Sequence, residues 1–507
     1  MEFSKYQKEV FNFVNNGNGN AVVSAVAGSG KTTTIVNAAK LVPSNKKVLF
    51  LAFNKNIVEE LSQRLQDCYN VKCSTSHAHG LQAIKKVYKY VRIFNGNRFF
   101  KDVTQCSVTE SEILSVDSPQ TLVYAFNKNS LKLLDLCRIN LVKNGDIESI
   151  EKLVDMYNIE IVADEVNFVN KLLSKAYIFD TKTKTIDFTD MLTLPLTESF
   201  VKFIPKYDFI FVDECQDLSK AQRELMLHSL KPNGRFIAVG DRKQAINGFA
   251  GASTDSFDLL ANLDNTKELP LSVNYRCGRS IIEMVKDIVP EIKSFENAIE
   301  GNVNYVKDFN GIVAGDMVLC RVTAPLVSLC LAFWKHGIKA YVRGNDIAEG
   351  LINLVLKQKV KTVSDLFRRF EKEKDNLEKQ LAAKNVKAPK NASKYVLLCD
   401  KIECIETIAE TNKTNSINEL LDKMKKLFSD VNDNEKVCLS TIHKAKGLES
   451  DTAWIILPEK LPLTFDGQKD WEYQQELNLK YVAYTRAKKT LNIVNLSQKE
   501  ILKAFNK

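Results

Sequence analysis

Short apolar runs alternate along this chain with longer segments in which apolar residues recur at helical spacing. The runs 21–24, 48–53, 207–212 and 236–239 are rich in Val, Ile, Leu, Phe and Ala, and a polar or glycine-containing turn follows each of them. Bounded apolar runs of this length are typical of strands, and the amphipathic segments between them are typical of helices. The pattern therefore predicts an α/β fold.

One of these turns has the composition of a phosphate-binding loop. Residues 25–32 read Ala-Val-Ala-Gly-Ser-Gly-Lys-Thr and stand between the strand-like run 21–24 and the helix-compatible run 33–40. A P-loop requires this strand–loop–helix context. The general pattern begins with Gly, whereas this chain has Ala25. We therefore expect a nucleoside triphosphate site at this loop.

The residue types in the loop suit phosphate chemistry. Gly28 and Gly30 allow a tight turn in which successive N–H groups point at an anion, and the following helix adds the positive end of its dipole. Lys31 is expected to reach the β- and γ-phosphates, and the Thr32 hydroxyl is expected to hold Mg²⁺.

Two acids follow the apolar run 207–212. Asp213 is expected to hold Mg²⁺ through water, and Glu214 is expected to orient and deprotonate the attacking water. Acids often end strands simply as turn formers, but a P-loop in the same chain gives this pair a specific meaning. The two segments together predict triphosphate hydrolysis with Mg²⁺.

Composition limits the class of protein. The 507 residues suggest three or four domains of about 150 residues each. Apolar residues make up 45% and charged residues 26%, as in ordinary globular proteins. No apolar run approaches the roughly 20 residues that span a bilayer, and the first residues lack the apolar core of a signal peptide. We therefore expect no membrane partner.

Cysteine usage and charge suggest a compartment and a partner. The eleven cysteines are scattered without a C-x-x-C pair, which indicates reduced thiols in a cytoplasmic setting rather than disulfides, a zinc site or an iron–sulfur cluster. The net charge of +9 makes a polyanion plausible as partner, with nucleic acid as the first candidate. Lys-rich solvated faces would give the same charge.

Six further motifs extend the series over most of the chain. They lie at 48–56, 74–80, 236–244, 271–276, 440–449 (Ser-Thr-Ile-His-Lys-Ala-Lys-Gly-Leu-Glu) and 481–489 (Tyr-Val-Ala-Tyr-Thr-Arg-Ala-Lys-Lys). In this order, from about residue 3 to residue 495, the motifs resemble those of a superfamily-1 helicase of the UvrD/Rep/PcrA type. The resemblance implies two RecA-like P-loop lobes, each a parallel sheet covered by helices, with ATP in the cleft between them and mostly helical inserted subdomains.

The motif order also implies domain boundaries. They are 1–80 and 187–275 for the first lobe, 81–186 for a helical insertion, 276–345 and 434–507 for the second lobe, and 346–433 for a reduced helical accessory subdomain. Within the insertion, residues 84–94 interleave basic and aromatic side chains. This pattern suits a helix that binds a nucleic-acid strand, or alternatively a solvated amphipathic helix.

The resemblance assigns roles around the nucleotide. Gln7 is similar to the glutamine that reads adenine, Tyr275 to the tyrosine that stacks on the base, and Glu449 to the residue that binds the ribose. Gln244 is similar to the sensor of the γ-phosphate. The residues implied to bind ATP are Gln7, Ala27, Gly28, Ser29, Gly30, Lys31, Thr32, Thr33, Tyr275 and Glu449.

Two arginines resemble the arginine fingers of this family. Arg276 and Arg486 would neutralise the charge that spreads over the γ-phosphoryl oxygens in the transition state. Because Arg486 would come from the second lobe, hydrolysis would depend on closure of the cleft. The implied catalytic set is Lys31, Asp213, Glu214, Gln244, Arg276 and Arg486.

Five residues occupy positions that resemble contacts to single-stranded DNA, namely Phe53, His77, Phe249, Thr441 and His443. The aromatics would stack on bases of any identity. The two phenylalanines can alternatively pack in the core, and the two histidines can alternatively cap or hinge a segment. Near Phe249 the chain departs from the family, because Asn247 and Ala250 replace an aromatic residue and an arginine.

The interpretation favoured by these motifs is an ATP-dependent DNA helicase or translocase. By resemblance it would move 3′ to 5′ on single-stranded DNA and unwind tailed duplexes. The alternative is a DNA-stimulated ATPase or sensor subunit that partners a separate nuclease, as in anti-phage defence, and unwinds little itself. The sequence ends soon after the last motif, so we expect no fused nuclease domain.

Overall fold

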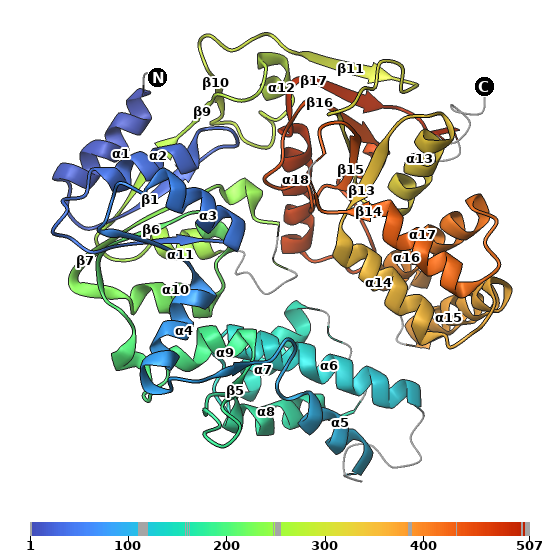
Figure 1. Cartoon of the computed structure of the whole chain (residues 1–507), viewed down its shortest axis with the longest axis horizontal. Helices are drawn as coiled ribbons and strands as arrows, with labels where there is room; N and C mark the ends of the chain where they lie inside the picture. Colours follow the sequence, from blue (N-terminus) through green and yellow to red (C-terminus); the bar gives the residue numbers. More distant parts are fainter. Residues whose placement is uncertain are drawn as a thin grey trace. The chain divides into compact units, whose positions relative to one another are not determined.

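The computed structural model describes residues 3–109, 120–157, 159, 161, 163–246, 248, 255–383, 388–431, 433–497 and 500–501. These residues pack as two compact units, and Figure 1 labels many of their helices and strands. The first unit comprises Met1–Ala25 and Gly30–Leu271, and the second comprises Val26–Ser29 and Ser272–Lys507. The predicted α/β class is confirmed, while the domain boundaries drawn from the motifs stay predictions.

A six-stranded sheet forms the centre of the first unit, in the order β3-β2-β6-β7-β1-β8. Neighbouring strands are all parallel. The strands are β1 (Asn20–Ala25), β2 (Val48–Ala52), β3 (Val71–Thr75), β6 (Tyr207–Val212), β7 (Leu230–Gly240) and β8 (Thr266–Leu271). The four strand-like runs of the sequence are therefore confirmed.

Both faces of this sheet are buried, which explains why its strands are apolar throughout. Phe50 and Phe211 face one hydrophobic cluster, and their neighbours Leu49 and Ile210 face another. Alternate side chains of a strand point to opposite faces, so each strand contributes to both clusters. The helices outside the insertion are α1 (Lys5–Asn16), α2 (Lys31–Lys40), α3 (Lys55–Arg64), α10 (Lys220–Leu227) and α11 (Ser256–Ala261), with 3₁₀ turns η3 (Cys215–Asp217) and η4 (Arg242–Gln244).

The segment between β3 and β6 is mostly helical, as predicted, and has a hydrophobic cluster of its own. Its elements are α4 (Ser76–Val87), β4 (Arg92–Ile93), α5 (Phe100–Thr109), α6 (Gln120–Ile139), α7 (Ile147–Met156), α8 (Glu165–Ala176), β5 (Thr185–Ile186), α9 (Phe188–Thr193), η1 (Leu194–Leu196) and η2 (Val201–Phe203).

The expectation of one helix over 84–94 is wrong, because α4 ends at Val87. The backbone becomes extended at Tyr88, whose ring stacks on that of Phe179 with the ring centroids 4.2 Å apart. The extended backbone then pairs with β5, since the N–H of Arg92 donates to Lys184 O at 2.9 Å. Aromatic packing and strand pairing therefore replace the last turns of the expected helix.

A parallel seven-stranded sheet forms the centre of the second unit, in the order β11-β17-β16-β12-β15-β13-β14. A separate parallel pair joins β9 to β10. The strands are β9 (Val273–Asn274), β10 (Lys293–Ser294), β11 (Asn302–Val306), β12 (Met317–Cys320), β13 (Ala340–Arg343), β14 (Phe428–Ser429), β15 (Val437–Thr441), β16 (Ser450–Ile456) and β17 (Ala487–Val494).

The helices between β13 and β14 share one core with this sheet. Phe370 and Ile405 belong to the same buried cluster as Val318 of β12. The Asp400 carboxylate also accepts hydrogen bonds from the backbone N–H groups of Thr323 and Ala324. The helices of the unit are α12 (Arg279–Glu283), α13 (Ala324–Lys335), α14 (Asn345–Lys357), α15 (Val363–Ala383), α16 (Ser393–Thr411), α17 (Ile417–Leu427) and α18 (Asp470–Tyr484), with η6 (Pro389–Asn391) and η7 (Pro458–Lys460).

Among the residues with described positions, no helix is both long and apolar enough to cross a membrane.

Candidate nucleotide site and nucleic-acid surface

The loop after β1 has the backbone of a phosphate cradle. Gly28 and Gly30 have φ angles of +65° and +77°, which favour glycine, and Gly30 caps α2. A Cβ on Gly28 would lie 2.6 Å from the Asn274 amide nitrogen, so a larger residue does not fit there. The buried Ser29 hydroxyl has no hydrogen-bond partner in the described structure. An unsatisfied buried hydroxyl at a helix N-terminus suits a bound phosphate.

The two acids after β6 lie against the end of this loop. The Thr32 hydroxyl donates to the Asp213 carboxylate at 2.8 Å, and the Lys31 ammonium is 3.0 Å from a Glu214 oxygen. The structure thus joins four of the predicted catalytic and metal-binding residues within the first unit. A hydroxyl and a carboxylate are ligands that Mg²⁺ prefers. The described residues include no cluster of three His, Cys, Asp or Glu that could hold a metal.

The charges in this cluster compensate one another. Burial alone would lower the pKa of Lys31, but the carboxylates of Glu214, Asp241 and Asp213 outweigh it and raise that pKa. Burial and the adjacent Glu214 raise the pKa of Asp213 to about 6. Lys31 therefore stays cationic, and an added cation would favour ionised Asp213.

Glu214 has a strained backbone, with φ 52° and ψ 45° in the left-handed region. Such a conformation costs on the order of 1–3 kcal/mol for a residue with a side chain. The Gln216 amide donates to the other Glu214 oxygen at 2.5 Å and so fixes the carboxylate that is predicted to activate water. Gln244 is the last residue of η4 and is buried. Its backbone N–H donates to the Asp241 carbonyl oxygen at 2.9 Å.

Gln7 lies beside the loop, but both ends of its amide already have partners. Its oxygen accepts the Ser4 N–H at 3.0 Å in the capping box of α1, and its nitrogen donates to the Thr34 hydroxyl at 3.1 Å. Reading adenine would require this side chain to exchange at least one partner. Thr33 lies in the first turn of α2.

Arg276, Tyr275 and Glu449 lie in the second unit. Tyr275 is half-exposed and packs against Phe295 at 5.1 Å between ring centroids. Arg276 Nε is 2.6 Å from one Glu449 oxygen, and Lys488 Nζ is 2.7 Å from the other. Burial alone would raise the pKa of Glu449, but the Lys488 hydrogen bond and these cations outweigh it and lower that pKa. Glu449 is therefore a carboxylate shared by two cations.

Arg486 is almost fully buried at the end of α18. Its guanidinium donates to the backbone oxygens of Val482 and Leu448, both at 2.9 Å. Backbone carbonyls thus hold the predicted finger within the described structure.

The predicted DNA contacts have different environments. Phe53 is 55% exposed at the end of β2, so the alternative that it packs in the core is wrong. His77 lies in the first turn of α4. In the second unit, Thr441 ends β15 and is buried, and burial together with Arg321 and Lys444 lowers the pKa of His443 to about 3. Phe249, Asn247 and Ala250 lie outside the described residues.

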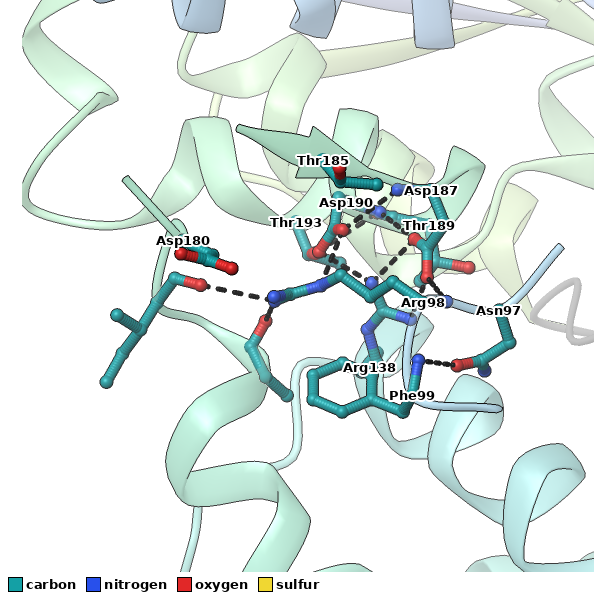
Figure 2. A network of polar contacts seen from close by, with 12 residues as sticks. Asn97, Arg98, Phe99, Arg138, Asp180, Thr185, Asp187, Thr189, Asp190 and Thr193 are labelled. Carbon is teal, nitrogen blue, oxygen red and sulfur yellow. Dashed lines mark hydrogen bonds and ion pairs between the residues drawn. The ribbon is translucent and has the colours of Figure 1, made fainter. Parts of the chain in front are cut away.

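Sequence reasoning missed Phe188, which is 52% exposed and packs edge-on against His77 at 6.0 Å. Asp187 and Asp190 flank Phe188 in the sequence, and Figure 2 shows the network in which Arg98 and Arg138 converge on these two acids. Arg138 is fully buried and binds both Asp187 oxygens, at 2.8 and 3.0 Å. The signal was the Asp-Phe-x-Asp spacing, which places the two acids on either side of Phe188.

The same two acids form the N-terminal capping box of α9. Asp190 also binds Arg138 at 2.7 Å and Arg98 at 2.7 Å. Burial raises the pKa of Asp190 to about 6, although the arginines oppose this shift. Arg98 in addition donates to Ala176 O at 2.9 Å, so the network connects α6, α8 and α9.

Comparison with known proteins finds similarity to helicases throughout. The model of the UvrD/REP helicase N-terminal domain matches residues 6–263. F-box DNA helicase protein 1 of Schizosaccharomyces pombe is 24% identical over 92% of this chain and 55% of that protein. ATP-dependent DNA helicase Rep of Buchnera aphidicola subsp. Baizongia pistaciae is 23% identical over 60% of this chain and 46% of that protein.

A probable DNA helicase of Mycoplasma pneumoniae is 24% identical over 95% of this chain and 81% of its own length. By contrast, the chain spans about half the length of the Schizosaccharomyces pombe and Buchnera aphidicola relatives. The matched segment holds the phosphate loop and the two acids that follow β6. Because the family model covers half of the chain, the chain belongs to the UvrD/REP helicase family.

Proposed function

We propose that this protein is an ATP-dependent DNA helicase or translocase that moves 3′ to 5′ on single-stranded DNA. The observation that carries the proposal is the pair of contacts between the phosphate loop and the two acids that follow β6. Thr32 donates a hydrogen bond to Asp213, and Lys31 forms an ion pair with Glu214. The names of the relatives, all DNA helicases, support DNA as the substrate.

In the proposed reaction ATP is the substrate, and Mg²⁺, when bound, would neutralise charge on its phosphates. Thr32 and Asp213 would hold the cation, and Lys31 would bind the phosphates. Glu214 exchanges its ion pair with Lys31 for the attacking water, which it orients and deprotonates. Arg276 and Arg486 neutralise the charge that develops on the phosphoryl oxygens, and Gln244 senses the γ-phosphate.

Around the base and ribose, we propose that Gln7 reads adenine, Tyr275 stacks on it, and Glu449 binds the ribose. For the DNA strand, we propose Phe53, His77, Thr441, His443 and Phe249, together with Phe188. Phe53 and Phe188 are exposed aromatics, which suits stacking on bases without sequence preference.

A strand-displacement assay on 3′-tailed and 5′-tailed duplexes tests the proposal. We expect ATP-dependent displacement from the 3′ tail and none from the 5′ tail, with ATP hydrolysis stimulated by single-stranded DNA. Displacement from the 5′ tail alone would contradict the polarity. DNA-stimulated hydrolysis without displacement from either tail would favour the alternative of a sensor ATPase that works with a separate nuclease.

A further inference from the structure

Both backbone polar atoms of Ala27 are held by buried side chains of the second unit, to which Val26–Ser29 also belongs. The Ala27 N–H donates to the Tyr481 hydroxyl at 2.6 Å. The Asn274 amide nitrogen donates to the Ala27 carbonyl at 2.6 Å. Tyr481 and Asn274 are both fully buried. The start of the phosphate loop is therefore fixed by two side chains rather than left to solvent.

Each of these side chains also fixes the segment that carries one predicted arginine finger. The Asn274 amide oxygen accepts the N–H of Arg276 at 2.9 Å and that of Cys277 at 2.7 Å. Tyr481 lies in the last turns of α18, and its carbonyl accepts the Thr485 hydroxyl at 2.8 Å. Arg486 follows Thr485 directly.

The two segments meet again away from the loop. The Cys277 thiol donates to the Thr485 carbonyl at 3.7 Å. The contacts thus form a closed ring that runs from Ala27 through Asn274 and Cys277 to Thr485, and back through Tyr481. Leaving a buried N–H or carbonyl without a partner costs more than an exposed hydrogen bond contributes, so the ring favours one arrangement of its members.

We infer that Tyr481 and Asn274 are positioning residues, which set residues Val26–Ser29 of the phosphate loop in register with both arginine fingers for hydrolysis. The inference rests on the proposed ATPase function. Neither side chain supplies charge to the triphosphate, because Lys31 and Thr32 carry that task in the proposal. Loss of either contact should therefore slow hydrolysis more than it weakens ATP binding.

Tyr481→Phe removes the hydroxyl and keeps the buried ring. We expect kcat for DNA-stimulated ATP hydrolysis to fall about tenfold, which corresponds to about 1.4 kcal/mol, while KM for ATP stays within about threefold. Tyr484→Phe is the matched control, since Tyr484 is a buried tyrosine at the end of α18, one helical turn after Tyr481, and its hydroxyl is outside the ring of contacts. We expect its kcat to stay within about twofold of wild type.

Asn274→Asp tests the other contact if Tyr481→Phe does not fold. Aspartate keeps the acceptor for Arg276 and Cys277 but cannot donate to the Ala27 carbonyl. We expect a similar loss of kcat. Since both contacts act through Ala27, the double variant should lose well under the roughly hundredfold that two independent tenfold effects would give.

Three results would overturn the inference while leaving the proposed function intact. They are a kcat within twofold of wild type in both single variants, an equal loss in Tyr484→Phe, or full additivity in the double variant. A wild-type protein that does not hydrolyse ATP would instead overturn the proposed function itself, and the inference with it.

Discussion

Replacing Glu214 by glutamine should separate ATP hydrolysis from ATP binding. The amide cannot accept a proton from water, and loss of a general base typically costs 10²- to 10⁴-fold in rate. We therefore expect kcat to fall by at least about a hundredfold. The backbone strain at φ 52° and the contact with Gln216 are compatible with glutamine, so the local fold should persist.

ATP affinity should hold steady or rise in this variant. In the wild-type protein the phosphates must displace the ion pair in which Lys31 and Glu214 are 3.0 Å apart. A partly exposed pair of this kind is worth about 1 kcal/mol at most, so removing it lowers the Kd for ATP by up to about fivefold. The expected pattern is thus a large loss of kcat with an unchanged or smaller Kd.

Single-turnover hydrolysis and titration with a fluorescent ATP analogue measure the two quantities. Asp208→Asn is the matched control, because Asp208 is a carboxylate on β6, the strand that precedes Glu214, and pairs with Lys231 at 2.7 Å. It should leave both quantities near wild type. Turnover of Glu214→Gln at the wild-type rate would refute its role as the base. A tenfold rise in Kd would show that Glu214 supports binding instead.

Further predictions address stability, pH and DNA. Arg138→Met removes the guanidinium partner of buried Asp187 and leaves buried Asp190 with Arg98 alone, so the free energy of unfolding in urea should fall by about 3–5 kcal/mol. Exposed Arg368→Met should lower it by under about 0.5 kcal/mol, and equal effects would contradict the prediction. Burial lowers the pKa of His79 from 6.5 to about 4, so the neutral ring stabilises the fold fully above pH 6.5. As the pH falls from 6.5 toward 4, the free energy of unfolding in urea should drop by about 3 kcal/mol, and His79→Gln should not show this drop. Phe53→Ala should weaken binding to a fluorescent oligo-dT by about 1–3 kcal/mol, whereas fully exposed Tyr69→Ala should not.

The parts of the fold that the sequence predicted correctly, and the local geometry of the candidate site, depend on local signals. Strands such as 207–212 are apolar along their whole length because both faces of their sheet are buried. The glycines at 28 and 30 are informative because their positive φ angles favour that residue type. Lys31 and Glu214 lie 3.0 Å apart because the turns that carry them follow two strands whose carboxyl ends lie at the same edge of a parallel sheet.

The parts that were missed depend on residues far apart in the chain. Arg138 lies on an amphipathic helix, where a charged residue is normally solvated, yet it is buried against acids 49 and 52 residues away. The positioning role that we propose for Tyr481 depends on its contact with Ala27, which is 454 residues away in the sequence. The end of α4 at Val87 likewise depends on the packing of Tyr88 against Phe179. Periodicity contains no information on such pairs.

The ion pairs of the candidate site suggest how nucleotide binding could be coupled to catalysis. Two of the cations proposed to meet the triphosphate already have acidic partners, Lys31 with Glu214 and Arg276 with Glu449. Each of those acids has a different task in the proposal, one toward water and the other toward the ribose. In the proposal, phosphate that attracts Lys31 would release Glu214 for water, and phosphate that attracts Arg276 would release Glu449 for the ribose. Without nucleotide the same pairs neutralise the charges, so that neither the partly exposed Lys31 nor the proposed general base is left uncompensated.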